Sequence, residues 1–171
     1  MEVNLKNKVW YDYLEDDLRE LLEQSFTLID LVPSWQESFH DYSFIVFPSA
    51  KAYEGFLKKM FLDMGFITQE DYYGRHFRIG KALNPQLEKQ YREAESVYDK
   101  LVEFCGGENL ANMLWDTWKN CRNLIFHWFP DEKRAITFEA AKSRVDEIIA
   151  SIDESFRECK IKVNDEERKS S

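Results

Sequence analysis

Residues 52–64 read AYEGFLKKMFLDM, and this stretch decides the fold. Its apolar side chains recur at i, i+3, i+4, i+7, i+8 and i+11, the spacing of a helix with one buried face. That face consists of Tyr53, Phe56, Leu57, Met60, Phe61 and Met64. The pattern predicts a core helix that starts near Phe44 or Ser49, with Pro48 suited to its first turn, and ends at Met64.

Apolar spacing of the same kind predicts four more helices, one before this stretch and three after it. Pro33, the pair Asn84-Pro85 and the pair Gly106-Gly107 are the sequence signals that begin or end them. Pro130 disfavours a helical residue 129 and should end the fourth helix between His127 and Phe129. The predicted helices cover residues 9–30, 85–105, 108–129 and 137–160, and residues 65–84 are predicted to be a long connection.

The composition agrees with an all-α protein. The chain has 171 residues, of which 44% are apolar, and only 6 are Gly and 4 are Pro. This length is typical of one domain with its own core. We therefore expect a single domain over residues 1–160, built as a bundle of about five helices, followed by a polar flexible tail over residues 161–171.

Charge and motifs exclude several classes of function. The net charge is −9, whereas proteins that coat nucleic acid need a broad basic surface. One short stretch, residues 74–81, is basic and contains no acid; its bases are Arg75, Arg78 and Lys81. The three cysteines form no CxxC pair, and no metal-binding or cofactor-binding motif occurs. With no apolar leader and no membrane-spanning run, we expect a cytoplasmic protein that needs neither metal nor cofactor.

The most informative motif reads Arg122-Asn123-Leu124-Ile125-Phe126-His127. A histidine can take a proton from a ribose 2′-hydroxyl or give one to a leaving oxygen. An arginine can neutralise the negative charge that builds on the phosphoryl oxygens in the transition state. Five residues turn an ideal helix by roughly 500°, so the two side chains would point about 140° apart. Either the helix end redirects His127, or a second copy of the chain completes the site across a two-fold axis.

The Arg-Asn-x3-His motif at the end of a fourth helix resembles the signature of the HEPN superfamily of helical ribonucleases. Residues 41–58, which read DYSFIVFPSAKAYEGFLK, resemble a helix of the RnlA/LsoA toxins within that superfamily. The resemblance covers about residues 10–160 and corresponds only to the C-terminal catalytic domain of those toxins. It implies that Glu54 joins Arg122 and His127 in the active site, with Asn123 orienting the arginine or the phosphate.

The resemblance implies a metal-independent endoribonuclease toxin of a toxin–antitoxin or phage-defence system. Its implied partners are an RNA substrate, a second copy of the chain and a cognate antitoxin or regulatory protein. Lys51 and Lys58, on one helix face with Glu54, and the bases Arg75, Arg78 and Lys81 are the residues expected to bind RNA.

An alternative is a non-catalytic HEPN-like module that docks a partner protein or a nucleotide. In that case Arg122 is a surface residue, and the helix dipole stabilises His127. The Lys51–Glu54–Lys58 face is then an ordinary surface ion pair, and the basic stretch is a solvated loop. The two alternatives differ in whether Arg122 and His127 meet solvent beside Glu54 or the histidine packs beneath Trp128 and Phe129.

Overall fold

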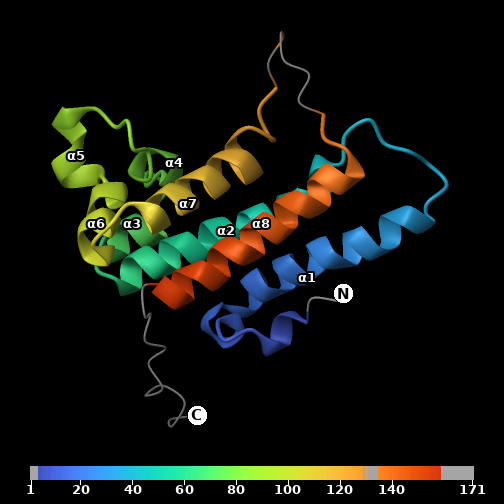
Figure 1. Ribbon diagram of the computed structural model, residues 1–171, viewed down its shortest axis with the longest axis horizontal. Coiled ribbons are helices and arrows are strands. Elements are labelled where there is room, and N and C mark those ends of the chain that lie inside the picture. Colours follow the sequence, from blue (N-terminus) through green and yellow to red (C-terminus); the bar gives the residue numbers. More distant parts are fainter. Residues whose placement is uncertain (1–3, 129, 131–134, 159–171) are drawn as a thin grey trace.

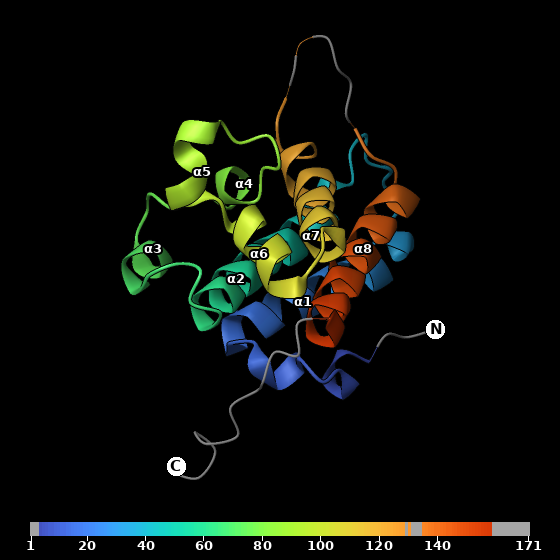
Figure 2. The ribbon, with the colours of Figure 1, turned by 60° about the vertical axis from the view of Figure 1, so that its left-hand side comes forward.

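The computed structural model describes residues 4–128, 130 and 135–158, which contain eight α-helices and no β-strand. Four helices form the body of the molecule and pack along its long axis (Figure 1). They are α1 (Asp16–Leu31), α2 (Ser43–Asp63), α7 (Asn109–Trp118) and α8 (Phe138–Glu158). The other four helices are short and gather toward one end (Figure 2). They are α3 (Gln69–Tyr73), α4 (Ile79–Ala82), α5 (Lys89–Glu95) and α6 (Val97–Cys105).

Helix α2 is the centre of the bundle and packs against both α1 and α8. It carries the predicted apolar face, on which Tyr53, Phe56, Leu57, Met60 and Phe61 are fully buried. The Tyr53 hydroxyl lies 2.8 Å from Ser151 Oγ of α8, which satisfies both polar groups inside the core. The predicted all-α bundle is therefore confirmed, with its core helix where the apolar spacing places it.

Two close approaches hold α1 against α2. A Cβ atom added at Gly55 would lie 2.5 Å from Leu18 Cδ2, so the absence of a side chain lets α1 come near. Further along, the buried Ser25 hydroxyl donates to Ile45 O at 2.8 Å and accepts from Ser49 N at 3.0 Å. A regular helix pairs the groups of residues 45 and 49 with each other. Ser25 thus bonds to α2 beside Pro48, which lacks an N–H.

The first predicted helix starts seven residues too early. The chain instead forms two 3-10 turns, η1 (Leu5–Asn7) and η2 (Tyr11–Tyr13), before α1 begins. Trp10 between them is fully buried, and its indole N–H donates to Asp153 of α8 at 2.6 Å. Lys8 pairs with the other oxygen of the same carboxylate at 2.6 Å. These tertiary contacts with α8 favour a turn where the sequence pattern favoured a helix.

The middle of the chain is more divided than predicted. The expected connection over residues 65–84 contains α3, which a Thr68–Asp71 capping box starts, and α4. The third predicted helix is broken at Ser96, whose side chain caps the start of α6 by accepting from Asp99 N. Its predicted end is confirmed, because Gly106 adopts the left-handed conformation that ends α6 (φ 68°).

The fourth predicted helix does not continue to residue 127. Helix α7 ends at Trp118 and is followed by η4 (Lys119–Asn123), a π-helical turn in which Leu124 N bonds to Lys119 O. The chain therefore leaves the helix before Pro130 can end it. The start of the last helix is confirmed, since the Thr137 hydroxyl accepts from Ala140 N at 3.2 Å.

One expectation falls on residues that the structure does not describe. The polar tail predicted over residues 161–171 lies outside the described residues. Within the described ranges, no helix combines the length and the apolar character that crossing a bilayer requires.

We predict that Ser25→Ala lowers the free energy of unfolding by about 1–3 kcal/mol, because it deprives two buried backbone groups of α2 of their partner. Chemical denaturation would measure the loss. Ser34→Ala is the matched control, since the exposed Ser34 hydroxyl also donates to a backbone carbonyl, that of Leu31. It should cost less than about 0.5 kcal/mol. Equal losses in the two variants would contradict a structural role for the Ser25 bridge.

Candidate functional site

Glu54 and Arg122 meet at the surface of the bundle. Glu54 lies on α2 and Arg122 on η4, and Arg122 Nη2 is 2.8 Å from Glu54 Oε2. Both side chains remain partly open to solvent, with exposed fractions of 33% and 38%. An ion pair this exposed adds only about 0–1 kcal/mol to stability. The pair is accessible to a ligand and contributes little to holding the fold together.

Trp118 forms the floor beneath the arginine. The Arg122 guanidinium lies over the Trp118 ring, 4.6 Å from its centroid, and the indole is almost fully buried. A Cβ atom added at Gly80 of α4 would lie 2.8 Å from Trp118 Nε1, so α4 packs directly on the indole edge. Stacking on Trp118 and pairing with Glu54 together restrict the guanidinium to one orientation.

The turn that carries Arg122 is anchored to α8. The Cys121 side chain is buried and contacts Arg144 O at 3.5 Å. Burial raises the pKa of the Cys121 thiol, which keeps it protonated and unreactive. Asn120 donates to Glu147 at 3.4 Å, and Glu147 also pairs with Arg144 at 2.6 Å. These contacts hold the two residues of η4 that precede the arginine against α8.

His127 follows η4 on an exposed segment. The Phe126 N–H still bonds to Arg122 O at 3.2 Å, and regular structure ends there. His127 is exposed, and so is Trp128 with 83% of its surface open, so the histidine does not pack beneath that tryptophan. Asn123, the last residue of η4, is exposed as well. The structure therefore places Asn123 and His127 on the solvent side, on the segment that continues from Arg122.

Lys51 and Lys58 flank Glu54 on α2, as their spacing predicts. All three line a groove of about 520 Å³ between α1 and α2. The α1 wall contributes Asp17 and Glu20, so acids outnumber bases in this groove. A phosphate chain would meet repulsion there as well as attraction, which makes the groove a poor path for RNA.

The predicted basic stretch lies beside the same site. Gly80 contacts Trp118, and the stretch therefore reaches the residue that supports Arg122. Lys81 is paired with Glu95 at 2.5 Å and lies over the Tyr91 ring, so its charge is partly neutralised. Arg75 and Arg78 are exposed, and no described residue forms an ion pair with either one. These two arginines are the available positive charges of the stretch.

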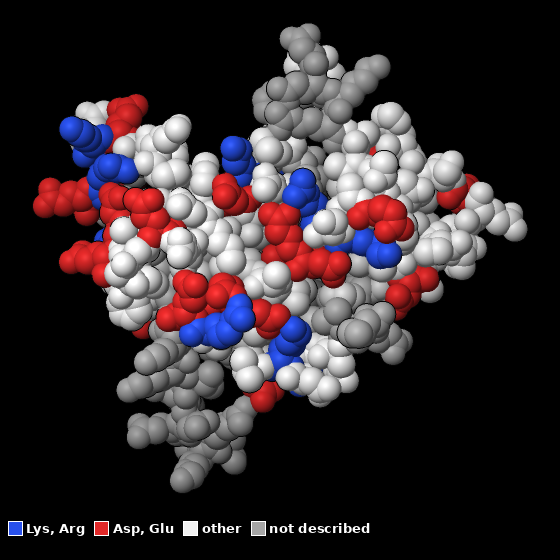
Figure 3. All heavy atoms as spheres, in the orientation of Figure 1, with Lys and Arg blue, Asp and Glu red and all other residues white. Residues whose placement is uncertain are grey.

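The surface charge explains why such a local group matters. On the face shown in Figure 3, Lys and Arg side chains occur singly or in small groups among Asp and Glu side chains. A net charge of −9 opposes a polyanion at long range. Bases that lack acidic partners are therefore the positions best suited to hold a phosphate backbone. The described residues also include no group of three or more His, Cys, Asp and Glu side chains arranged to hold a metal ion.

Sequence reasoning brought Glu54 and Arg122 together correctly but missed the residues that position the arginine. Trp118 precedes Arg122 by four residues, a spacing that brings side chains into contact on a helix, and this signal was available. Gly80 gave no such signal, because its role depends on α4 crossing the indole of a distant helix.

Comparison with known families gives one match. Residues 13–84 match the family model described as RnaseLS-like HEPN, a range that runs from η2 to just beyond α4. The matched range includes Glu54, both groove lysines and the basic stretch, and it ends before Arg122. No curated protein and no solved structure matches the chain. Over residues 13–84, which carry the central helix and the glutamate of the candidate site, this chain is thus similar to the RnaseLS-like HEPN family.

Proposed function

We propose that this protein is an endoribonuclease toxin of the HEPN type, part of a toxin–antitoxin or phage-defence system and restrained by a cognate antitoxin. The observation that carries the proposal is the partly exposed ion pair between Glu54 and Arg122, 2.8 Å apart. The two residues come from distant segments, and they are two of the residues that the toxin resemblance predicts for the active site. The family match over residues 13–84 supports the same class.

The proposed reaction is an internal transfer within RNA. The ribose 2′-oxygen forms a bond to the adjacent phosphorus and gives up its proton to a base. The bond from phosphorus to the 5′-oxygen then breaks, and that oxygen takes a proton from an acid. The products are a 2′,3′-cyclic phosphate and a 5′-hydroxyl, so atoms balance without water, an oxidant or a cofactor.

Each residue of the motif has a distinct role in this proposal. Arg122 stabilises the negative charge that grows on the phosphoryl oxygens, and its preset orientation means that little reorganisation is needed during the reaction. His127 is the general acid or base. Glu54 holds Arg122 and is available for proton transfer, and Asn123 orients the arginine or the phosphate.

A non-catalytic binding module remains the second candidate. Its sequence-based criterion was a histidine packed beneath Trp128 and Phe129. The exposure of His127 and Trp128 supports the enzyme instead, and Phe129 lies outside the described residues. The binding module would predict tight RNA or protein association with no turnover.

We predict that Arg122→Ala lowers the rate of RNA cleavage by about 10²–10³, because charge on the phosphoryl oxygens is no longer stabilised. His127→Ala should lower it by about 10²–10⁴, because proton transfer loses its acid or base. Gel analysis of bulk RNA with added chelator would measure both effects, and wild-type cleavage should persist with chelator present.

Two variants control for charge and residue type. Arg157→Ala removes an arginine that also pairs with a glutamate, Glu154 of α8, and His40→Ala removes another exposed histidine. Both controls should cleave at the wild-type rate. Wild-type rates in Arg122→Ala and His127→Ala would refute the proposed enzyme.

We predict that Arg75→Glu combined with Arg78→Glu weakens binding of single-stranded RNA. The slope of log affinity against log salt should fall by about 0.7 for each phosphate that the variant no longer neutralises. Titration of labelled RNA at several salt concentrations, in a His127→Ala background, would measure this change. The control is Lys142→Glu combined with Arg157→Glu, which changes the charge equally on α8. An identical slope in the loop variant would place the RNA backbone elsewhere.

We predict a homodimer that brings two Arg-Asn-x3-His segments together. Apolar side chains stand exposed beside the motif: Phe47 has 56% of its surface open and packs on Phe126, and Trp128 has 83% open. Burying them between two copies would remove this surface from water. Light scattering should show a dimer for the wild type and a monomer for Phe47→Ser combined with Trp128→Ser. A wild-type monomer with full activity would contradict the dimeric site.

A further inference from the structure

A second cavity lies across α4 from the Glu54–Arg122 pair. Its volume is about 350 Å³, within the range of small-molecule sites. Helix α4 lines it with Lys81 and Ala82 and contacts Trp118 with Gly80. The same short helix therefore borders both this cavity and the support of Arg122. Neither the sequence pattern nor the family match assigns a role to the cavity.

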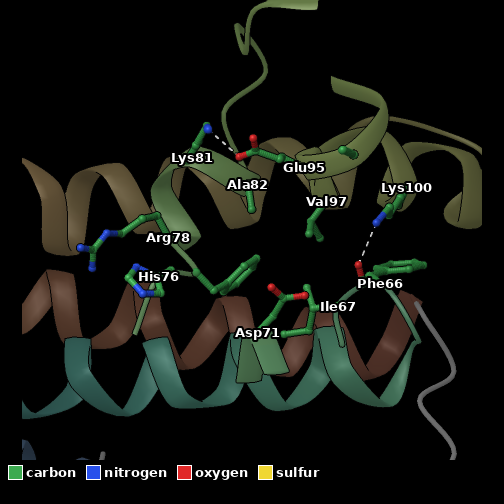
Figure 4. A pocket seen from close by; sticks show the side chains of 12 residues that line it. Phe66, Ile67, Asp71, His76, Arg78, Lys81, Ala82, Glu95, Val97 and Lys100 are labelled. Carbon is green, nitrogen blue, oxygen red and sulfur yellow. Dashed lines mark hydrogen bonds and ion pairs between the residues drawn. The ribbon is translucent and has the colours of Figure 1, made fainter. Parts of the chain in front are cut away.

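One of the two carboxylates that line the cavity, Asp71, has an oxygen that accepts no hydrogen bond from a described residue. Asp71 projects into the space (Figure 4). Its Oδ2 atom accepts both the N–H and the hydroxyl of Thr68, at 3.0 and 2.8 Å, and no described residue donates to Oδ1. The Thr68 hydrogen bonds lower the pKa of the Asp71 carboxyl. A carboxylate only accepts, so the ligand group that faces Asp71 must be a donor.

The other charged side chains around the cavity favour an anionic ligand. Lys81 pairs with Glu95 at 2.5 Å, and Lys100 donates to the Phe66 carbonyl at 2.8 Å (Figure 4). Arg78 and His76 lie together at one end of the cavity. The lining therefore holds three permanent positive charges against the two acids Asp71 and Glu95. A small cation would be repelled, whereas a phosphate at the Arg78 end would be attracted.

The remaining lining is aromatic and aliphatic, which suits a flat ring. Phe66, Phe77, Ile67 and Val97 line the cavity. RNA-binding proteins commonly receive unstacked bases on such apolar surfaces and read their edges by hydrogen bonds. A suitable ligand is therefore a planar ring that packs on the apolar residues, carries a hydrogen-bond donor toward Asp71 and has a phosphate attached at the Arg78 end.

Only one common RNA base has the required edge. Guanine places two adjacent donors, N1–H and the N2 amino group, side by side. Adenine and cytosine each place a ring acceptor beside their amino group, and uracil places its single N–H between two carbonyls. An acceptor facing the Asp71 carboxylate would be repelled. The chemistry of the cavity therefore selects guanine among the four bases.

We propose that this cavity binds a guanine base of single-stranded RNA, with the free Oδ1 of Asp71 accepting from both N1–H and the N2 amino group and Arg78 holding the adjacent phosphate. The inference rests on the proposed function in requiring an RNA ligand. It adds that cleavage is directed to sites near an unpaired guanosine. The strand passes from the cavity over α4 toward Arg122.

The test measures binding rather than cleavage. Labelled oligouridines that carry one central guanosine, adenosine, cytidine or inosine are titrated into His127→Ala protein and followed by fluorescence anisotropy. We expect guanosine to bind about tenfold tighter than adenosine or cytidine, as a paired hydrogen-bond contact to a base edge provides. Inosine lacks only the N2 amino group and should bind less tightly than guanosine. Equal affinities for all four oligonucleotides would overturn the proposal.

A variant pair locates the effect at Asp71. Asp71→Asn keeps an oxygen for Thr68 and turns an amide N–H toward the ring, so the guanosine preference should be lost. Glu70→Gln removes the same charge from the neighbouring exposed residue, which does not line the cavity, and should keep the preference. A guanosine preference that survives in Asp71→Asn protein, with circular dichroism showing it folded, would also overturn the proposal.

Two further outcomes separate this inference from other ligands and from the proposed enzyme. Free guanosine monophosphate that binds as tightly as the guanosine oligonucleotide would show a site for a free nucleotide and overturn the RNA assignment. Wild-type protein that prefers guanosine but leaves RNA intact would refute the proposed nuclease and retain the guanine site. Wild-type protein that cleaves RNA but binds all four oligonucleotides equally would support the proposed nuclease and refute the guanine site.

Discussion

The packing of α1 on α2 is the constraint on which the rest of the structure depends. Leu18 reaches the backbone of α2 because residue 55 has no side chain, and Ser25 bonds to the α2 backbone beside Pro48. Helix α2 also contacts α8 and η4, so the seating of α1 positions the helix against which both of them pack. Glu54 precedes Gly55 on α2, so the contact that fixes the helix pair also fixes the glutamate of the candidate site.

The position of Arg122 depends on a π-helical turn and on its contacts with α8 and Trp118. A π-helical turn carries the arginine, and such turns are rare in helices and frequent at functional sites. The buried Cys121 and the Asn120–Glu147 contact hold this turn against α8. Trp118 then sets the plane of the guanidinium. The arginine is fixed by its surroundings, whereas His127 stands on an exposed segment beyond the turn.

The acidic surface and the RNA proposal are consistent because positive charge is concentrated where it has no acidic partner. The groove beside Lys51 and Lys58 contains more acids than bases. Arg75 and Arg78 are exposed on the stretch whose Gly80 touches Trp118. The cavity that Asp71 faces lies along the same stretch. One short segment thus connects the proposed backbone binding and the proposed base reading with the support of the candidate catalytic arginine.

The sequence by itself determined the helical class, the buried face of α2 and the start of α8, because these follow from local spacing and capping. Through a family resemblance, it also indicated that Glu54 and Arg122 belong together. Tertiary structure alone decided that residues 9–15 form turns, since the indole N–H of Trp10 donates a hydrogen bond to Asp153 of α8. It also decided that the fourth helix changes to a π turn at Lys119, and that α4 packs on Trp118. These features depend on side chains from distant segments competing with local helix preference, and no local pattern records that competition.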